Sequence, residues 1–72
     1  MTRIVVLGEP ERVRAFRLAG AQVVEASDPD AVRRAWAARP TDMAVLVLTP
    51  TAARVLERER AAERRLVWVA MP

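Results

Sequence analysis

The feature that most constrains this 72-residue chain is a regular alternation of short apolar runs with polar segments that begin near a proline. Four runs rich in Val, Ile and Leu cover residues 3–7, 22–26, 43–48 and 66–70. Because each run is too short for a buried helix, we expect four β-strands. The three segments between them have helix-compatible compositions. The resulting order, β-α-β-α-β-α-β, predicts an α/β fold with a parallel sheet.

The first two helix-like segments carry clear boundary signals. Pro10 opens the first segment, and Gly20 follows its predicted last residue, where a positive φ angle favours glycine. Asp28 is the predicted N-cap of the second segment, with Pro29 in its first turn. That second helix is expected to stop at Arg39-Pro40.

The third segment repeats the cap-plus-proline signature at Thr49 and is predicted to form one continuous helix. Its charges alternate in sign every three residues, at Arg54, Glu57, Arg60 and Glu63. Such a ladder is typical of a solvated helix face and adds a few tenths of a kcal/mol per pair.

By analogy with flavodoxin-like folds, we predict one three-layer domain over residues 1–72 with strand order 2-1-3-4. In that order the first helix covers one sheet face alone, and the other two share the opposite face. Half of the first face is then left bare, so we expect a C-terminal segment, a second copy or a partner protein to cover it. For the isolated chain we predict a symmetric dimer with Trp68 and Met71 near the contact.

Four residues are therefore candidates for a partner interface. Trp68 is central in the last strand and is either a core residue or a partner contact. Leu18 lies opposite Phe16 on a helical wheel, so it either packs into the following loop or contacts a partner. Ala70 and Met71 complete the predicted interface at the end of the chain.

The sequence contains none of the usual catalytic constellations. It has no Cys and no His, which removes thiolate metal sites, the usual general base and the commonest metal ligand. The loop after the first strand has the single glycine Gly8, too few for a dinucleotide fingerprint or P-loop. Phosphorelay receiver chemistry is excluded, because no Asp follows the third strand and the chain has no Lys. Glu9 and Thr49 should lie close together, but helix capping explains them more simply than a polar site does. We predict no enzyme activity, no cofactor and no metal.

Charge and hydropathy argue for a cytosolic globular domain. Twelve basic residues, all Arg, and nine acidic residues give a net charge of +3, which is weak support for nucleic-acid binding. The longest uncharged stretch, residues 43–53, is too short to span a bilayer and contains Pro50. No signal peptide is indicated.

Several segments together resemble a known family. They are RIVVLG at residues 3–8, AFRLAG at 15–20, SDPDA at 27–31, MAVLVLT at 43–49 and LVWVAMP at 66–72. This set is similar to the F subunit of archaeal/vacuolar-type (A/V-type) rotary ATPases. The FRLAG portion is the distinctive one. Ala15 departs from the pattern, since many family members carry Gly there.

The resemblance implies the N-terminal domain of a non-catalytic central-stalk (rotor) subunit that binds the coiled-coil stalk subunit. Such a subunit couples or regulates ATP hydrolysis or synthesis with ion transport, such as proton transport, in a complex peripheral to the membrane. Family members continue into a C-terminal helical segment that contacts the stalk, and this sequence is expected to lack it. The alternative is a degenerate receiver-like module that binds a small ligand, a protein or nucleic acid.

Overall fold

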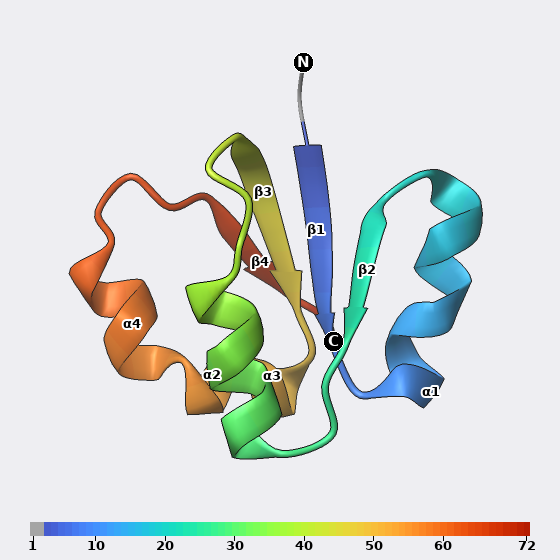
Figure 1. Ribbon diagram of the computed structural model, residues 1–72, viewed down its shortest axis with the longest axis horizontal. Coiled ribbons are helices and arrows are strands. Elements are labelled where there is room, and N and C mark those ends of the chain that lie inside the picture. Colours follow the sequence, from blue (N-terminus) through green and yellow to red (C-terminus); the bar gives the residue numbers. More distant parts are fainter. Residues whose placement is uncertain (1–2) are drawn as a thin grey trace.

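The computed structural model describes residues 3–72 as one four-stranded sheet with flanking helices (Figure 1). In chain order the elements are β1 (Arg3–Gly8), α1 (Pro10–Val13), the 3₁₀-helix η1 (Arg14–Ala19), β2 (Gln22–Glu25), α2 (Pro29–Ala37), β3 (Met43–Leu48), α3 (Pro50–Val55), α4 (Glu57–Ala62) and β4 (Trp68–Ala70). All neighbouring strands are parallel, and their order is β2-β1-β3-β4. The predicted fold class and strand order are confirmed.

The sheet is the middle of three layers. Figure 1 shows α1 and η1 on one side of it and α2, α3 and α4 on the other. The main core lies between the sheet and α2 and α3, because strand side chains alternate between faces. Its buried members are Val5, Leu7, Ala26, Val32, Leu46, Leu48, Ala52, Ala53 and Leu56. Val6 and Val13 are also buried but lie outside this cluster, as expected for the α1 side of the sheet.

The first helical segment has the predicted extent but not the predicted type. Only its first turn is α-helical, and residues 14–19 form a 3₁₀-helix that ends at Gly20, whose φ is +81°. Side chains three residues apart eclipse each other in a 3₁₀-helix. Arg14 and Arg17 therefore reach the same carboxylate, and each lies 3.2 Å from Glu25 Oε2. The glycine C-cap is confirmed, and the expectation of a single α-helix is wrong.

The second helix begins as predicted and ends early. Asp28 accepts a hydrogen bond from the Ala31 backbone N–H at 2.8 Å, which confirms the N-cap. The helix ends at Ala37 rather than at Arg39-Pro40. Arg39 instead stacks on Trp36, with its guanidinium carbon 3.9 Å from the ring centroid.

The predicted third helix is divided in two at Leu56, and its charge ladder does not form. Leu56 is completely buried, and its φ of −96° and ψ of 17° separate α3 from α4. The break leaves the Ala53 carbonyl available, and Arg60 donates to it from Nη2 at 2.7 Å and from Nε at 3.1 Å. The Arg60 guanidinium also stacks on Trp68 at 3.9 Å. Glu63 pairs with Arg39 at 3.5 Å instead of with Arg60.

Arg60 should therefore stabilise the fold more than an ordinary surface arginine does. Replacing Arg60 by alanine removes two hydrogen bonds and a cation–π contact, so we expect the free energy of unfolding to fall by about 1–2 kcal/mol. Urea titration followed by tryptophan fluorescence measures this loss. Arg58→Ala on the exposed side of α4 is the matched control, and it should change stability by less than about 0.5 kcal/mol. Equal losses for both variants would contradict this assignment.

Candidate interaction surface

The carboxyl edge of the sheet is the usual ligand site of a parallel α/β fold. Here that edge holds a packed capping structure. Thr49 is fully buried, and its Oγ1 donates to Glu9 Oε1 at 2.6 Å. The same oxygen accepts from the Ala52 backbone N–H at 3.3 Å, which caps α3. Thr49 also packs against Gly8, where an added Cβ would overlap its side chain. Glu9 and Thr49 are together, as expected, but they fill this edge rather than open it to a ligand.

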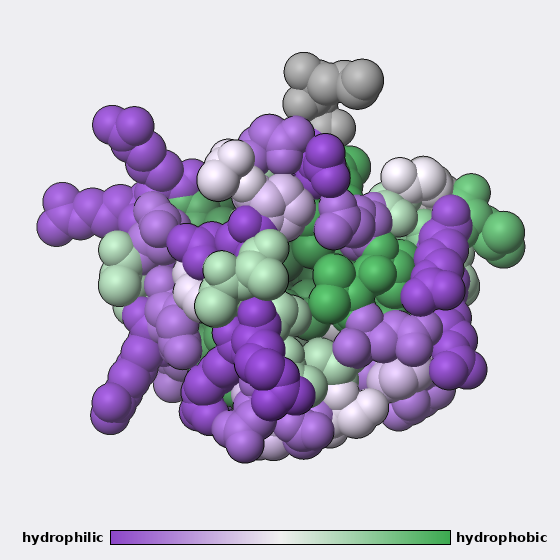
Figure 2. Space-filling model, in the orientation of Figure 1, coloured by the Kyte–Doolittle hydropathy of each residue, from purple (hydrophilic) through white to green (hydrophobic). Residues whose placement is uncertain are grey.

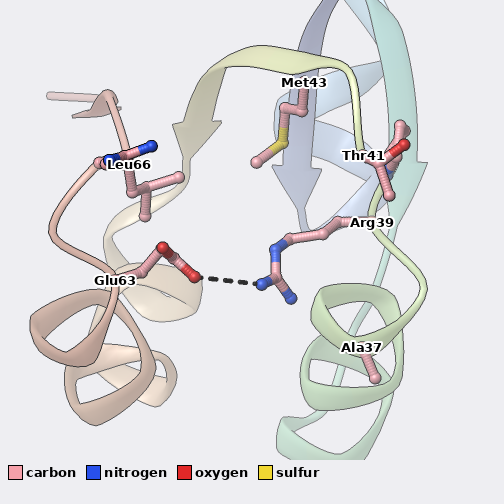
Figure 3. Close-up of a pocket in the computed structure, with 8 residues that line it drawn as sticks. Ala37, Arg39, Thr41, Met43, Glu63 and Leu66 are labelled. Atoms are coloured by element: carbon pink, nitrogen blue, oxygen red, sulfur yellow. Dashed lines mark ion pairs between the residues drawn. The ribbon is translucent and has the colours of Figure 1, made fainter.

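A groove of about 450 Å³ lies at the opposite end of the sheet, beside the start of β3. Figure 3 shows Arg39 and Glu63 pointing toward each other across it, with Met43 and Leu66 contributing apolar side chains. The 3.5 Å ion pair between Arg39 and Glu63 spans the groove and links the ends of α2 and α4. The charges of Arg39 and Glu63 neutralise each other, and Arg65 is the one further charged residue in the lining.

The remaining candidate is a sheet face without a helix over it. In the parallel register, Ile4 pairs with Val45, and Val6 pairs with Val47, which pairs in turn with Val69. Paired side chains of parallel strands lie on the same face, so these residues share the face on the α1 side. Val67 and Met71 alternate with Trp68 and Ala70 along the last strand and therefore lie on it too. We call Ile4, Val45, Val47, Val67, Val69 and Met71 the open face.

The open face is apolar and accessible. Ile4 is 43% exposed, Val67 56% and Val69 53%, whereas Val6 under α1 is only 1% exposed. This difference in exposed fraction shows that α1 covers the sheet at Val6 and does not extend over the open face. Four of its six members are valines, and a fifth is isoleucine, so the surface is stiff because β-branched side chains have few rotamers. A contiguous apolar surface of this kind marks an interaction site more often than a free surface does.

The structure separates the four predicted interface residues. Met71 lies on the open face, and its backbone N–H continues the ladder by donating to the Leu48 carbonyl at 2.8 Å. Trp68 pairs with the core residue Leu46, and Ala70 with Leu48, so both lie on the opposite face. Leu18 is 95% exposed on η1, away from β4.

Of the two roles considered for Trp68, its pairing with Leu46 favours a place on the core side of the sheet, where the residue is still 37% exposed. Val67 and Val69, which the structure exposes on the open face, were not among the predicted residues.

Within residues 3–72, no group of three or more Asp and Glu side chains is placed to hold a metal ion. No helix in the same residues is long and apolar enough to cross a membrane.

Comparison with known proteins identifies the fold. No protein-family model matches the chain, and no curated protein matches it by sequence. Among solved structures, it is similar to the crystal structure of the F subunit of the V-type ATP synthase from Archaeoglobus fulgidus. The TM-score is 0.58 at 22% sequence identity, and the match covers 94% of this chain and 96% of that one. At this identity the likeness establishes a shared α/β fold over nearly the whole of both chains.

Proposed function

We propose that this protein is a non-catalytic rotor subunit of an A/V-type ATPase, in the position of the F subunit. The observation that carries the proposal is the structural likeness to the Archaeoglobus fulgidus protein, which extends over 94% of this chain. The sequence resemblance at residues 3–8 and 15–20 supports the same family. The subunit belongs to the part of the complex that is peripheral to the membrane. The complex couples ATP hydrolysis or synthesis to ion transport.

We further propose that the open face binds the coiled-coil stalk subunit. A flat sheet face of β-branched side chains is complementary to apolar side chains exposed on the outer surface of a coiled coil. The exposed Val67 and Val69 are at the centre of the proposed contact. When the stalk subunit is absent, the same face is free to pair with a second copy, so self-association and stalk binding should compete.

The alternative function is a degenerate receiver-like module that binds a small ligand, a protein or nucleic acid. The filled carboxyl edge at Thr49 disfavours a small ligand at the site where such folds usually bind one. Nucleic acid would have to be held by arginines. Two of these, Arg3 and Arg39, already pair with one carboxylate each.

Co-purification separates the two functions. The chain is co-expressed with the coiled-coil stalk subunit encoded in the same genome and passed over a sizing column at about 150 mM salt. We expect a stable complex whose elution changes little at 500 mM salt, because the proposed contact is apolar. Absence of this complex, together with DNA binding that weakens steeply with salt, would support the alternative instead.

A further inference from the structure

The outer edge of β2 is a second candidate for binding, distinct from the open face. β2 is at the end of the sheet order, so in the part of the chain that the structure describes only its β1 side is paired. The Ala26 backbone N–H donates to the Gly8 carbonyl of β1 at 2.8 Å. Backbone groups alternate in direction along a strand, so those of Gln22 and Val24 also face β1, and those of Val23 and Glu25 face outward. An edge of this kind can pair with another extended chain.

An apolar crevice runs alongside this edge, between β2 and α2. Its lining is mainly apolar and includes Val24, Ala35, Trp36, Leu7 and Leu46, with Arg39 as its one charged residue. Figure 2 shows apolar surface over β2 between the hydrophilic surfaces of α1 and α2. The crevice measures about 180 Å³. A cavity of about 150 Å³ in another protein accommodates benzene, so this space can take one apolar side chain of a ligand.

The other side of the same edge carries excess positive charge. Glu25 points toward η1, where Arg14 and Arg17 both lie 3.2 Å from one of its oxygens. Two guanidinium groups thus share one carboxylate, which leaves a net charge of +1 at this position. Both arginine side chains are at least 60% exposed and can bind a further carboxylate.

We propose that the outer edge of β2 binds an extended segment of a partner protein as a fifth strand. The segment carries apolar side chains at alternate positions, which face α2 and enter the crevice. The intervening side chains are acidic and face Arg14 and Arg17. Backbone hydrogen bonds to Val23 and Glu25 hold the segment against β2. The apolar crevice on one face and the arginines on the other favour a segment whose apolar and acidic side chains alternate. This surface is independent of the function proposed above.

A blocked seven-residue peptide with Val and Glu at alternate positions is the probe, titrated into the ¹⁵N-labelled chain and observed by NMR. We expect saturable shifts at the amides of Val23 and Glu25, together with slower hydrogen exchange there. The same peptide with Lys in place of Glu should bind at least tenfold more weakly. Equal binding of both peptides, or no shift at 1 mM peptide, would overturn the proposal.

A matched pair of variants tests the backbone contact. Glu25→Ala and Glu25→Pro both remove the carboxylate, but only proline removes the outward N–H while leaving the β1 ladder intact. We expect Glu25→Ala to bind the peptide as well as the native chain or more tightly, and Glu25→Pro to bind at least tenfold more weakly than Glu25→Ala. Equal affinities would contradict strand pairing.

A second pair tests the crevice and serves if Glu25→Pro fails to fold. Ala35→Leu places a larger side chain in the crevice, whereas Ala61→Leu makes the same change on the exposed surface of α4. We expect Ala35→Leu to weaken peptide binding at least fivefold and Ala61→Leu to leave it unchanged. Unchanged binding in Ala35→Leu would exclude insertion of a side chain.

Discussion

Replacing Gly8 by alanine is expected to lower the free energy of unfolding by about 2–3 kcal/mol, because the site is already filled. A Cβ at this position would overlap the side chain of Thr49, which is fully buried and cannot move outward. Moving Thr49 would also disturb its hydrogen bond to Glu9 and its cap on α3. A domain of this size is stable by only about 4–11 kcal/mol, so the loss should be plain in a urea titration.

A double-mutant cycle checks the physical cause. Thr49→Ala removes the overlapping atoms, so Gly8→Ala should cost at least about 1 kcal/mol less in that background than in the native one. Gly20→Ala is the control for glycine replacement in general. Gly20 has a φ of +81° but open space around it, so its replacement should cost only about 1 kcal/mol, from backbone strain alone. Strictly additive effects of Gly8→Ala and Thr49→Ala would contradict the packing described at this edge.

Introducing a charge on the open face is expected to abolish both proposed associations of the chain. Val69→Glu places a carboxylate at the centre of the contact, where burial without a partner is costly. We expect affinity for the stalk subunit to fall at least a hundredfold and self-association at micromolar concentration to disappear in analytical ultracentrifugation. The fold should persist, since Val69 is 53% exposed on an edge strand.

Leu18→Glu is the matched control, because it makes the same kind of change at an exposed apolar residue away from the open face. It should leave both associations within about twofold of native values. Loss of stalk binding in Leu18→Glu but not in Val69→Glu would show that the stalk subunit binds at η1 and not at the open face. A native chain that remains monomeric at all concentrations would contradict the self-association.

The parallel fold could be predicted because local signals and connectivity agree. Pro10, Asp28 and Thr49 each mark a helix start in the sequence, and short right-handed crossovers leave few ways to order four strands. The break at Leu56 could not be predicted in the same way. The charge pattern continues across it, and only packing of Leu56 into the core and of Arg60 onto Trp68 interrupts the helix.

The bare sheet face could be predicted from the sequence, but of the residues on it only Met71 was. Connectivity alone indicates that a sheet face lacks a helix, and the structure contains this face. Assigning Trp68 to it required the register of β4, which places Trp68 beside Leu46 and exposes Val67 and Val69 on the other side. A strand of three residues has no sequence signal strong enough to fix its register, because both of its faces are apolar.

The central proposal, that the open face binds the coiled-coil stalk subunit, is tested most directly by methyl NMR of the valine-labelled chain. The labelled chain is titrated with the stalk subunit, and all valine methyl signals are followed together. We expect the methyl signals of Val67, Val69 and Val47 to shift and saturate at one stalk subunit per chain, while Val32 in the opposite core stays unchanged. Shifts confined to other valines, or no shifts at all with a folded stalk subunit in excess, would contradict the account.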